Sequence, residues 1–304
     1  MSADRRPGIA ARGNPFLTAR GKPLVVGHRG VPRLHQENTL AGFRRAVALG
    51  IPAVELDVVL TADRRAVVCH DHDVERLTGV RGLVSELTWD RLSRLRVRRE
   101  LPMGIDVGGA PVVVRYQRAE PIPLLAEVLA ELAGKAAIDI ELKLGQPRWW
   151  RVEVAEVVAR EIVAAGVTDQ VVVTSFDPRK LWAARRVHRD LAIGFAFDDG
   201  MLDVVGPARG RRLLARVLAT DPVGRALGTR LVGAEHTLID ADVVARLHRQ
   251  GVAIGAYTLF PVGSTTGKPI AASAATDAEA TRLVELGVDW IETDDPERLQ
   301  DLIG

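Results

Sequence analysis

Short apolar runs of strand length recur along the chain and alternate with longer segments that carry a helical period. The runs are apolar on both faces, which is typical of strands buried on both sides of a parallel sheet. Nine such runs occur: LVV at 24–26, AVELDVVL at 53–60, AVVCH at 66–70, AAIDIEL at 136–142, QVVVTSF at 170–176, LAIGFAF at 191–197, RLVGA at 230–234, GVAIGAYTLF at 251–260 and VDWIET at 288–293. The helical segments lie at 38–50, 124–134, 152–166, 241–251 and 277–287, and each ends in glycine, a frequent helix stop.

This alternation predicts an α/β fold, and at this length a closed TIM (β/α)8 barrel is favoured over an open sheet. Nine runs compete for eight places, so one of the later runs is expected to be peripheral, and RLVGA at 230–234 is the weakest. We expect an N-terminal extension at 1–22 and one barrel domain at 23–304.

The alternation breaks over residues 72–120, which predicts a small insertion on one βα loop after the third strand. Its arginine run at 91–99 is interpreted as a solvated face rather than a surface for anions. A second irregular stretch at 261–277 is rich in Gly, Ser and Thr. It is expected to be a long loop, either a lid over the substrate or a disordered insertion.

Composition narrows the class of protein. The chain of 304 residues is 47 % hydrophobic, enough for a sizeable core, and no stretch approaches the about 18 uncharged apolar residues of a membrane helix. A net charge of +2 does not favour nucleic-acid binding. The first twenty residues lack an apolar signal segment, which predicts a cytoplasmic location. The single cysteine, Cys69, excludes a disulfide framework and is expected to lie in the core.

Two motifs invite a misleading interpretation. The segment from Gly263 to Lys268 resembles a phosphate-binding loop, but it has three residues between its glycines and Pro269 after the lysine. The pair His70 and His72 resembles a metal-hydrolase motif, but no further histidines end later strands except His236.

Carboxylates gather at the downstream ends of the predicted strands, where an α/β barrel builds its active site. Glu55 and Asp57 are two residues apart in one strand and therefore face the same side, as do Asp139, Glu141 and Lys143 in another. Burying such a set is costly unless a cation compensates it. We therefore predict that Glu55, Asp57 and Glu141 bind one divalent cation, Mg²⁺ or Ca²⁺. The alternative is a structural ion-pair network of these carboxylates with Arg29 and Lys143.

Two histidines lie at the ends of the first and third predicted strands and are candidates for acid and base. His28 and His70 would flank a substrate beside the metal, one taking a proton and the other protonating the leaving group. Arg29 and Lys143 add positive charge suited to phosphate oxygens. Together these residues describe a site that cleaves a phosphate ester.

At this point the chain resembles the glycerophosphodiester phosphodiesterase family. The resemblance runs from about residue 24 to 296 and is carried by motifs in order: His28-Arg29-Gly30, Glu37-Asn38-Thr39, Glu55-Leu56-Asp57, His70-Asp71 with Arg76 and Thr78-Gly79, Ile122-Pro123 with Glu127-Val128-Leu129, Glu141-Leu142-Lys143, Ser175-Phe176-Asp177, and Gly287-Val288-Asp289 with Thr293-Asp294.

The resemblance implies a TIM barrel, a metal held by Glu55, Asp57 and Glu141, His28 and His70 as the acid/base pair, and Arg29 and Lys143 on the phosphate. It also implies that a glycerol hydroxyl attacks phosphorus and that water opens the resulting cyclic phosphate. Glu37-Asn38-Thr39 is interpreted mainly as a helix cap, with Asn38 also near the metal, and Asp71 as an orienting residue rather than a ligand.

The chain departs from the family at Tyr257-Thr258-Leu259-Phe260, where Trp-Thr-Val-Asn is usual. An aromatic residue remains at Tyr257 to contact the substrate, but the Asn side chain is lost. The leading function is hydrolysis of glycerophosphodiesters to an alcohol and glycerol 3-phosphate. One alternative is a lysophospholipase D acting on lysophospholipids. The other is a catalytically silent scaffold on the same fold, against which the intact set of candidate residues argues.

Overall fold

The computed structural model describes residues 13–17, 21–144 and 151–304. Its strands are β1 (Leu24–Gly27), β2 (Ala53–Leu60), β3 (Ala66–Val68), β4 (Arg96–Val97), β5 (Glu100–Ile105), β6 (Pro111–Arg115), β7 (Glu120–Pro121), β8 (Ala137–Leu142), β9 (Val171–Ser175), β10 (Ala192–Phe197), β11 (Leu231–Glu235), β12 (Ala253–Leu259) and β13 (Trp290–Thr293). Its α-helices are α1 (Leu40–Ala48), α2 (Glu75–Thr78), α3 (Trp89–Leu92), α4 (Leu125–Leu132), α5 (Glu153–Ala165), α6 (Pro178–Val187), α7 (Pro207–Thr220), α8 (Pro222–Leu227), α9 (Ala241–Arg249), α10 (Asp277–Leu286) and α11 (Pro296–Ile303).

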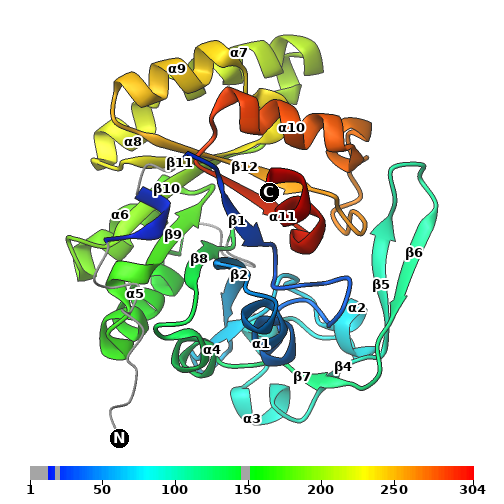
Figure 1. Cartoon of the computed structure of the whole chain (residues 1–304). Helices are drawn as coiled ribbons and strands as arrows, with labels where there is room; N and C mark the ends of the chain where they lie inside the picture. Colours follow the sequence, from blue (N-terminus) through cyan, green and yellow to red (C-terminus); the bar gives the residue numbers. More distant parts are fainter. Residues whose placement is uncertain (1–12, 18–20, 145–150) are drawn as a thin grey trace, which may run out of the picture.

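Eight parallel strands close into a barrel, which confirms the predicted fold class. They run in the order β1, β13, β12, β11, β10, β9, β8, β2, and β2 pairs with β1 to complete the ring. Helices α1, α4, α5, α6, α7, α9, α10 and α11 surround the ring, and the insertion lies to one side (Figure 1). Because the eight strands are parallel, their carboxyl ends all lie at the same end of the barrel, which we call the mouth.

The peripheral strand is not the one that the sequence pattern suggests. RLVGA at 230–234 forms β11, a full barrel member between β10 and β12, whereas β3 pairs antiparallel with β2 outside the ring. Only the turn 61–65 joins β2 to β3, closed by the backbone bond from Thr61 to Arg65. So short a connection cannot cross over to a parallel strand, so β3 must return antiparallel. The third barrel strand is consequently β8.

The insertion is a folded unit with its own apolar cluster. It contains α2, α3 and the hairpin β5–β6, and Leu92, Leu101 and Met103 are buried in its core. Cys69 belongs to the same cluster, fully buried, and burial raises the pKa of its thiol, in agreement with the expected core role. The arginines of the run 91–99 include exposed Arg91, Arg94 and Arg96, and Arg94 pairs with Asp90.

The segment 261–276, which we call the strap, is ordered against the insertion. The backbones of Ser264 and Ile105 exchange hydrogen bonds of 2.8 and 3.2 Å. Lys268 reaches across to Asp198, with its Nζ 2.6 Å from the carboxylate. The strap therefore joins the hairpin β5–β6 to the loop after β10, and the expectation of a disordered insertion is wrong for it.

The opposite end of the barrel is closed by residues near the N-terminus. Phe16, within the predicted N-terminal extension, packs edge-on against Trp290 with ring centroids 5.7 Å apart. Gly255 makes room for this indole, since an added Cβ would lie 1.7 Å from it. No helix among the described residues is long and apolar enough to cross a membrane.

Candidate functional site

Three carboxylates meet at the mouth because β2 and β8 are direct neighbours. Their register sets Glu55 beside Asp139 and Asp57 beside Glu141. Oxygen atoms of Glu55, Asp57 and Glu141 all lie within 4.8 Å of one another. The structure therefore brings together the three residues that the sequence assigns to one metal, and hard divalent cations prefer such oxygen donors.

Two basic side chains border this carboxylate triad. The Nζ of Lys143 lies 2.9 Å from Glu141 and 3.2 Å from Asp57. The Nε of Arg29 lies 3.3 Å from Asp57, and the backbone N–H of Arg29 donates to Glu55 at 2.9 Å. The ion pairs expected of a structural network thus exist, but they leave Glu55 with no lysine or arginine side chain among the described residues.

This uneven pairing separates the pKa values of the triad. Burial and the neighbouring Asp57 raise the pKa of Glu55 well above its ordinary value. Burial also acts to raise the pKa of Asp57, but Lys143, His70 and Arg29 outweigh it and the pKa falls below its ordinary value. A cation bound at the triad would supply the positive charge that Glu55 lacks.

His28 follows β1 and is held by the last barrel strand. Its Nδ1 lies 2.6 Å from Oδ1 of Asp294, and its Nε2 lies 3.9 Å from Glu55. The other oxygen of Asp294 accepts a 2.7 Å bond from the backbone N–H of Val262 in the strap. Asp294 thus links His28 to the strap. The sequence shows Asp294 only as part of a weak motif, because nothing local indicates that β13 closes the barrel beside β1.

His70 follows β3 and enters the site from the edge of the ring. Its Nδ1 lies 2.7 Å from Asp71, which agrees with the expected orienting role of that aspartate. Burial, together with the positive charge of Arg29 and Lys143, lowers the pKa of His70. The imidazole is therefore held neutral over a wider pH range than a free histidine.

Glu37, His70 and Asp71 form a second group with the spacing of metal ligands, but an arginine side chain already pairs with its two carboxylates. Arg76 bonds to both carboxylates, with its Nε 2.5 Å from Asp71 and an Nη 2.7 Å from Glu37. Because Arg29 also lies 3.1 Å from Glu37, the two guanidinium groups together balance the two carboxylates, and the group serves to hold His70 in place.

The tripeptide Glu37-Asn38-Thr39 caps α1 as expected, but through Thr39, and Asn38 has a second role. The cap of α1 is Thr39, whose hydroxyl accepts from the N–H of Gly42. Asn38 has a left-handed backbone, with φ of 57°, and its amide donates to Asp57 at 2.8 Å. It fixes one oxygen of a triad carboxylate, as the second part of the sequence interpretation proposed.

Tyr257 lies on the inner wall of the barrel beside a small cavity of about 50 Å³. Its hydroxyl donates to the carbonyl oxygen of Phe197 at 2.6 Å, and its ring meets Phe176 edge-on. Tyr257 therefore offers a ring rather than a hydroxyl to any ligand.

Glu292 and Asp139 also line this cavity. Burial raises the pKa of Asp139 to about 7. Sequence reasoning overlooked Glu292, because its place beside the triad depends on which strand closes the ring.

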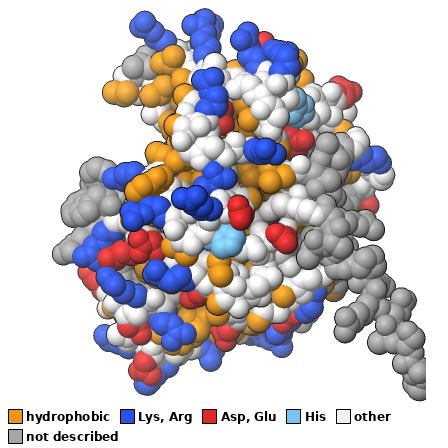
Figure 2. All heavy atoms as spheres, turned by 90° about the vertical axis from the view of Figure 1, so that its left-hand side faces the viewer, with side chains coloured by type: hydrophobic (Ala, Val, Ile, Leu, Met, Phe, Trp, Pro, Cys, Tyr) orange, Lys and Arg blue, Asp and Glu red, His pale blue; other side chains and the backbone are white. Residues whose placement is uncertain are grey.

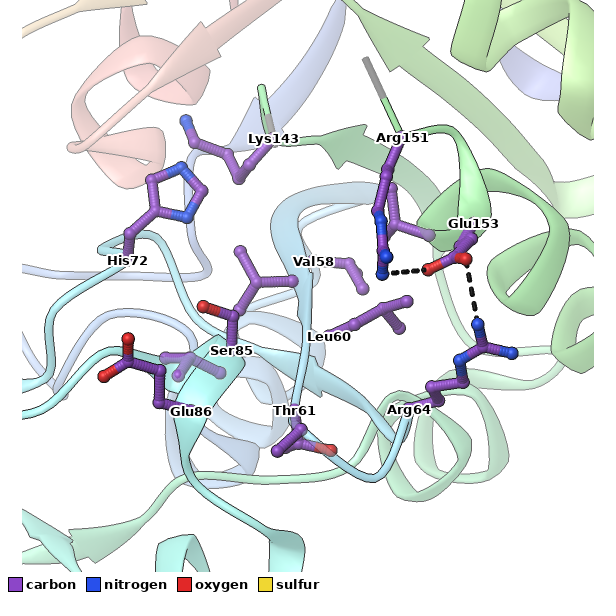
Figure 3. Close-up of a pocket in the computed structure, with 14 residues that line it drawn as sticks. Val58, Leu60, Thr61, Arg64, His72, Ser85, Glu86, Lys143, Arg151 and Glu153 are labelled. Atoms are coloured by element: carbon purple, nitrogen blue, oxygen red, sulfur yellow. Dashed lines mark hydrogen bonds and ion pairs between the residues drawn. The ribbon is translucent and has the colours of Figure 1, made fainter. Parts of the chain in front are cut away.

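Two larger cavities adjoin Lys143 on either side. One, of about 340 Å³, extends from Glu141 past Phe176 and Met201 to Lys268. The other, of about 360 Å³, is drawn in Figure 3, where Lys143 and His72 lie at one end. At its far end Glu153 bridges Arg64 and Arg151. Glu153 thus balances one of the two positive charges there.

Comparisons with known proteins agree with this geometry. The model of the Glycerophosphoryl diester phosphodiesterase family matches residues 28–298. The chain is 28 % identical to the glycerophosphodiester phosphodiesterase of Caldanaerobacter subterraneus, over 93 % of this chain and 98 % of that one. A lysophospholipase D of Rattus norvegicus is 33 % identical over 39 % of this chain and 36 % of its own. The crystal structure of a putative glycerophosphoryl diester phosphodiesterase from Silicibacter pomeroyi matches with a TM-score of 0.74 and 25 % identity, over 98 % and 97 % of the chains.

Proposed function

The chain belongs to the glycerophosphoryl diester phosphodiesterase family and is a phosphoric diester hydrolase, and from this premise we propose that it hydrolyses glycerophosphodiesters to an alcohol and glycerol 3-phosphate with a divalent cation and two histidines. One observation carries the proposal: the carboxylates of Glu55, Asp57 and Glu141 converge at the barrel mouth between His28 and the basic groups Arg29 and Lys143.

The residues present fit a metal. Glu55, Asp57 and Glu141 would hold Mg²⁺ or Ca²⁺, because carboxylate oxygens are ligands of both ions. A cation would also balance the charge of Glu55, which has no lysine or arginine side chain as a partner among the described residues. When bound, the ion would polarise the phosphoryl group and stabilise charge on its oxygens. Arg29 and Lys143 would orient the same phosphate from the protein side.

The histidines would move the protons. With Nδ1 engaged by aspartate in both His28 and His70, Nε2 is the nitrogen left to exchange a proton. One histidine would take the proton from the attacking glycerol hydroxyl while the other protonates the oxygen of the leaving alcohol. In the second half, the roles reverse and water opens the cyclic phosphate to glycerol 3-phosphate. The ring of Tyr257 would border the substrate.

The test is release of glycerol 3-phosphate from glycerophosphocholine by protein treated with EDTA and then supplied with Mg²⁺ or Ca²⁺. We expect metal-restored activity, lost in His28→Ala and His70→Ala. His248→Ala is the matched control, because His248 lies on the outer helix α9 beside Asp289 and should retain activity. Turnover that survives both EDTA and removal of either histidine would refute the mechanism.

A lysophospholipase D activity is the second candidate, favoured by the apolar lining of one cavity. Leu144, Phe176 and Met201 line the cavity of about 340 Å³ that begins at Glu141, so an acyl chain could lie along it. Turnover of lysophosphatidylcholine but not glycerophosphocholine would support this candidate. Absence of turnover with either substrate would favour the silent scaffold. The cytoplasmic location stays a prediction.

A further inference from the structure

A basic and apolar surface borders the barrel mouth on the segment after β10. The segment begins with Asp198, Asp199 and Asp203, but from residue 204 to 234 it has six arginines and a single acidic residue, Asp221, which is buried. Figure 2 shows Lys and Arg side chains with hydrophobic ones among them at the top of the molecule, the region of α7 and α9 in Figure 1. We define the α7 patch as the exposed residues Met201, Val204, Arg209, Arg212, Leu213 and Arg216.

The helix orders four of these residues on one face. Arg209, Arg212, Leu213 and Arg216 follow the spacing i, i+3, i+4 and i+7, which places them side by side on a helix surface. The buried positions, which include Leu214 and Leu218, point toward the core instead. The patch is thus the solvent face of an amphipathic helix.

The loop before this helix packs its backbone against the helix, and its apolar side chains are exposed to solvent. Gly210 approaches the Leu202 carbonyl so closely that an added Cβ would lie 2.4 Å from the oxygen. Val204, which follows, is 91 % exposed, an unusual state for a valine in water. Leu213 and Met201 are also exposed. The apolar side chains project beside the arginines because the backbone is packed that way.

The charge of the patch is not compensated within the described residues. The nearest acidic contact is made by Arg211, 3.7 Å from Asp199, and no ion pair is found for Arg209, Arg212 or Arg216. About half of the other exposed arginines among the described residues have a carboxylate partner, such as Arg94, whereas three arginines on one face of α7 have none. Uncompensated arginines interleaved with exposed apolar side chains match an anionic lipid surface, which offers phosphates above hydrocarbon.

We propose that the α7 patch docks this enzyme on an anionic lipid surface. The arginines would contact lipid phosphates while Val204 and Leu213 enter the interfacial region. Met201 belongs both to the patch and to the cavity that reaches Glu141 and Lys143, so docking would place the mouth next to the bilayer. A nucleic acid is the less suitable polyanion, because the patch offers aliphatic side chains and no aromatic ring for stacking. The docking does not depend on which phosphodiester is the substrate.

The experiment is cosedimentation of the purified full chain with vesicles of phosphatidylcholine alone and of phosphatidylcholine with phosphatidylglycerol in a two-to-one ratio. We expect binding only to the anionic vesicles, weakened by salt because surface charges are screened. Each arginine removed should weaken binding about five-fold, so Arg209→Glu with Arg212→Glu should lower it well over ten-fold. Val204→Asp should weaken it in the same direction without changing an arginine.

Matched controls separate docking from folding and from general charge. Arg91→Glu with Arg94→Glu makes the same charge change on the insertion, and it should leave vesicle binding intact. Hydrolysis of soluble glycerophosphocholine by the patch variants should equal that of the unmodified chain, which shows that they fold. The proposal is overturned if anionic vesicles are not bound, if both double variants lose binding equally, or if Val204→Asp has no effect and the protein binds RNA as tightly as lipid.

Discussion

Each candidate catalytic histidine is held at Nδ1 by an aspartate, but the two aspartates differ in what holds them. Asp71 is clamped by Arg76, which also binds Glu37. Asp294 has no arginine partner among the described residues, and its second oxygen accepts a backbone N–H from the strap. His70 is therefore positioned by a charged network within the insertion, and His28 by the junction of β13 with the strap.

Replacing Asp294 by Asn tests the orientation of His28. The amide can still bond Nδ1, but it favours the wrong tautomer, so kcat should fall by about a hundredfold or more while KM changes little. The pH profile of kcat should shift as well, which a purely structural loss would not cause. Asp295→Asn is the control, because its side chain caps α11 and pairs with Arg33 away from His28. Equal losses in both variants would contradict the role of Asp294.

A pH-dependent contribution to stability is expected from Glu279, on α10. Hydrogen bonds from Arg282, then from His236, lower its pKa from 4.5 to about 2. Between these values the unfolded chain takes up a proton that the folded chain does not, so this stabilisation is complete above pH 4.5 and is lost as the pH falls toward 2.

Glu279→Gln should therefore lower the free energy of unfolding by about 1–2 kcal/mol at neutral pH. Urea titrations at a series of pH values should show the difference shrinking on acidification. Glu285→Gln, an exposed position on the same helix, should change little at any pH. A difference that grows at low pH would reverse the assigned direction.

At the residue scale the sequence could predict the residues whose strand neighbours face the same way. Glu55 with Asp57, and Glu141 with Lys143, follow from the two-residue period of a strand. Glu292 and Asp294 could not be predicted, because their place depends on which strand closes the ring. The bond from Asn38 to Asp57 depends on a left-handed backbone that the tripeptide alone does not indicate.

At the scale of elements, the length of a connection decides whether an apolar run becomes a parallel barrel strand, which the apolar pattern alone does not determine. Both β3 and β11 appear as short apolar runs, yet the five-residue turn before β3 forces it antiparallel and out of the ring. The strap is a comparable case, since its composition predicts a loop but not the hairpin that it contacts. That contact depends on glycines on both sides: an added Cβ at Gly104 would lie 1.7 Å from the Ser264 oxygen, and one at Gly263 would lie 2.2 Å from the Met103 oxygen.

Gly104→Ala should therefore separate the strap from the hairpin. Its φ of +80° disfavours alanine, and the added Cβ would overlap Ser264, so the free energy of unfolding should fall by about 3 kcal/mol or more. Gly109→Ala is the matched control: its φ of +83° is similar, but nothing lies within 4 Å, so only about 1–2 kcal/mol of backbone strain is expected. Urea unfolding of both variants measures the difference, and equal losses would show that the contact contributes nothing.

At the scale of the whole molecule, the barrel encloses more negative charge at its mouth than it compensates. Glu55, Asp139 and Glu292 are buried with raised pKa values, because burial and neighbouring carboxylates disfavour their charged forms. Lys143 pairs with Asp57 and Glu141, and Arg29 pairs with Glu37 and Asp57. The apolar side chains stabilise the barrel, whereas the buried carboxylates lower its free energy of unfolding. A bound cation should therefore raise global stability as well as support catalysis.

Adding Mg²⁺ or Ca²⁺ to EDTA-treated protein should consequently raise the Tm, since a ligand that binds only the folded state stabilises it. At a hundred times the Kd the gain is about 2.7 kcal/mol, which for a chain of this size corresponds to roughly 5 °C. Glu55→Gln should abolish the response, because it removes a triad oxygen that no lysine or arginine side chain neutralises. Glu235→Gln should retain it: burial and Asp199 raise the pKa of Glu235 to about 8, and the residue lies outside the triad on β11. If the Tm rises equally in both variants, the cation binds elsewhere and the triad is an ion-pair network alone.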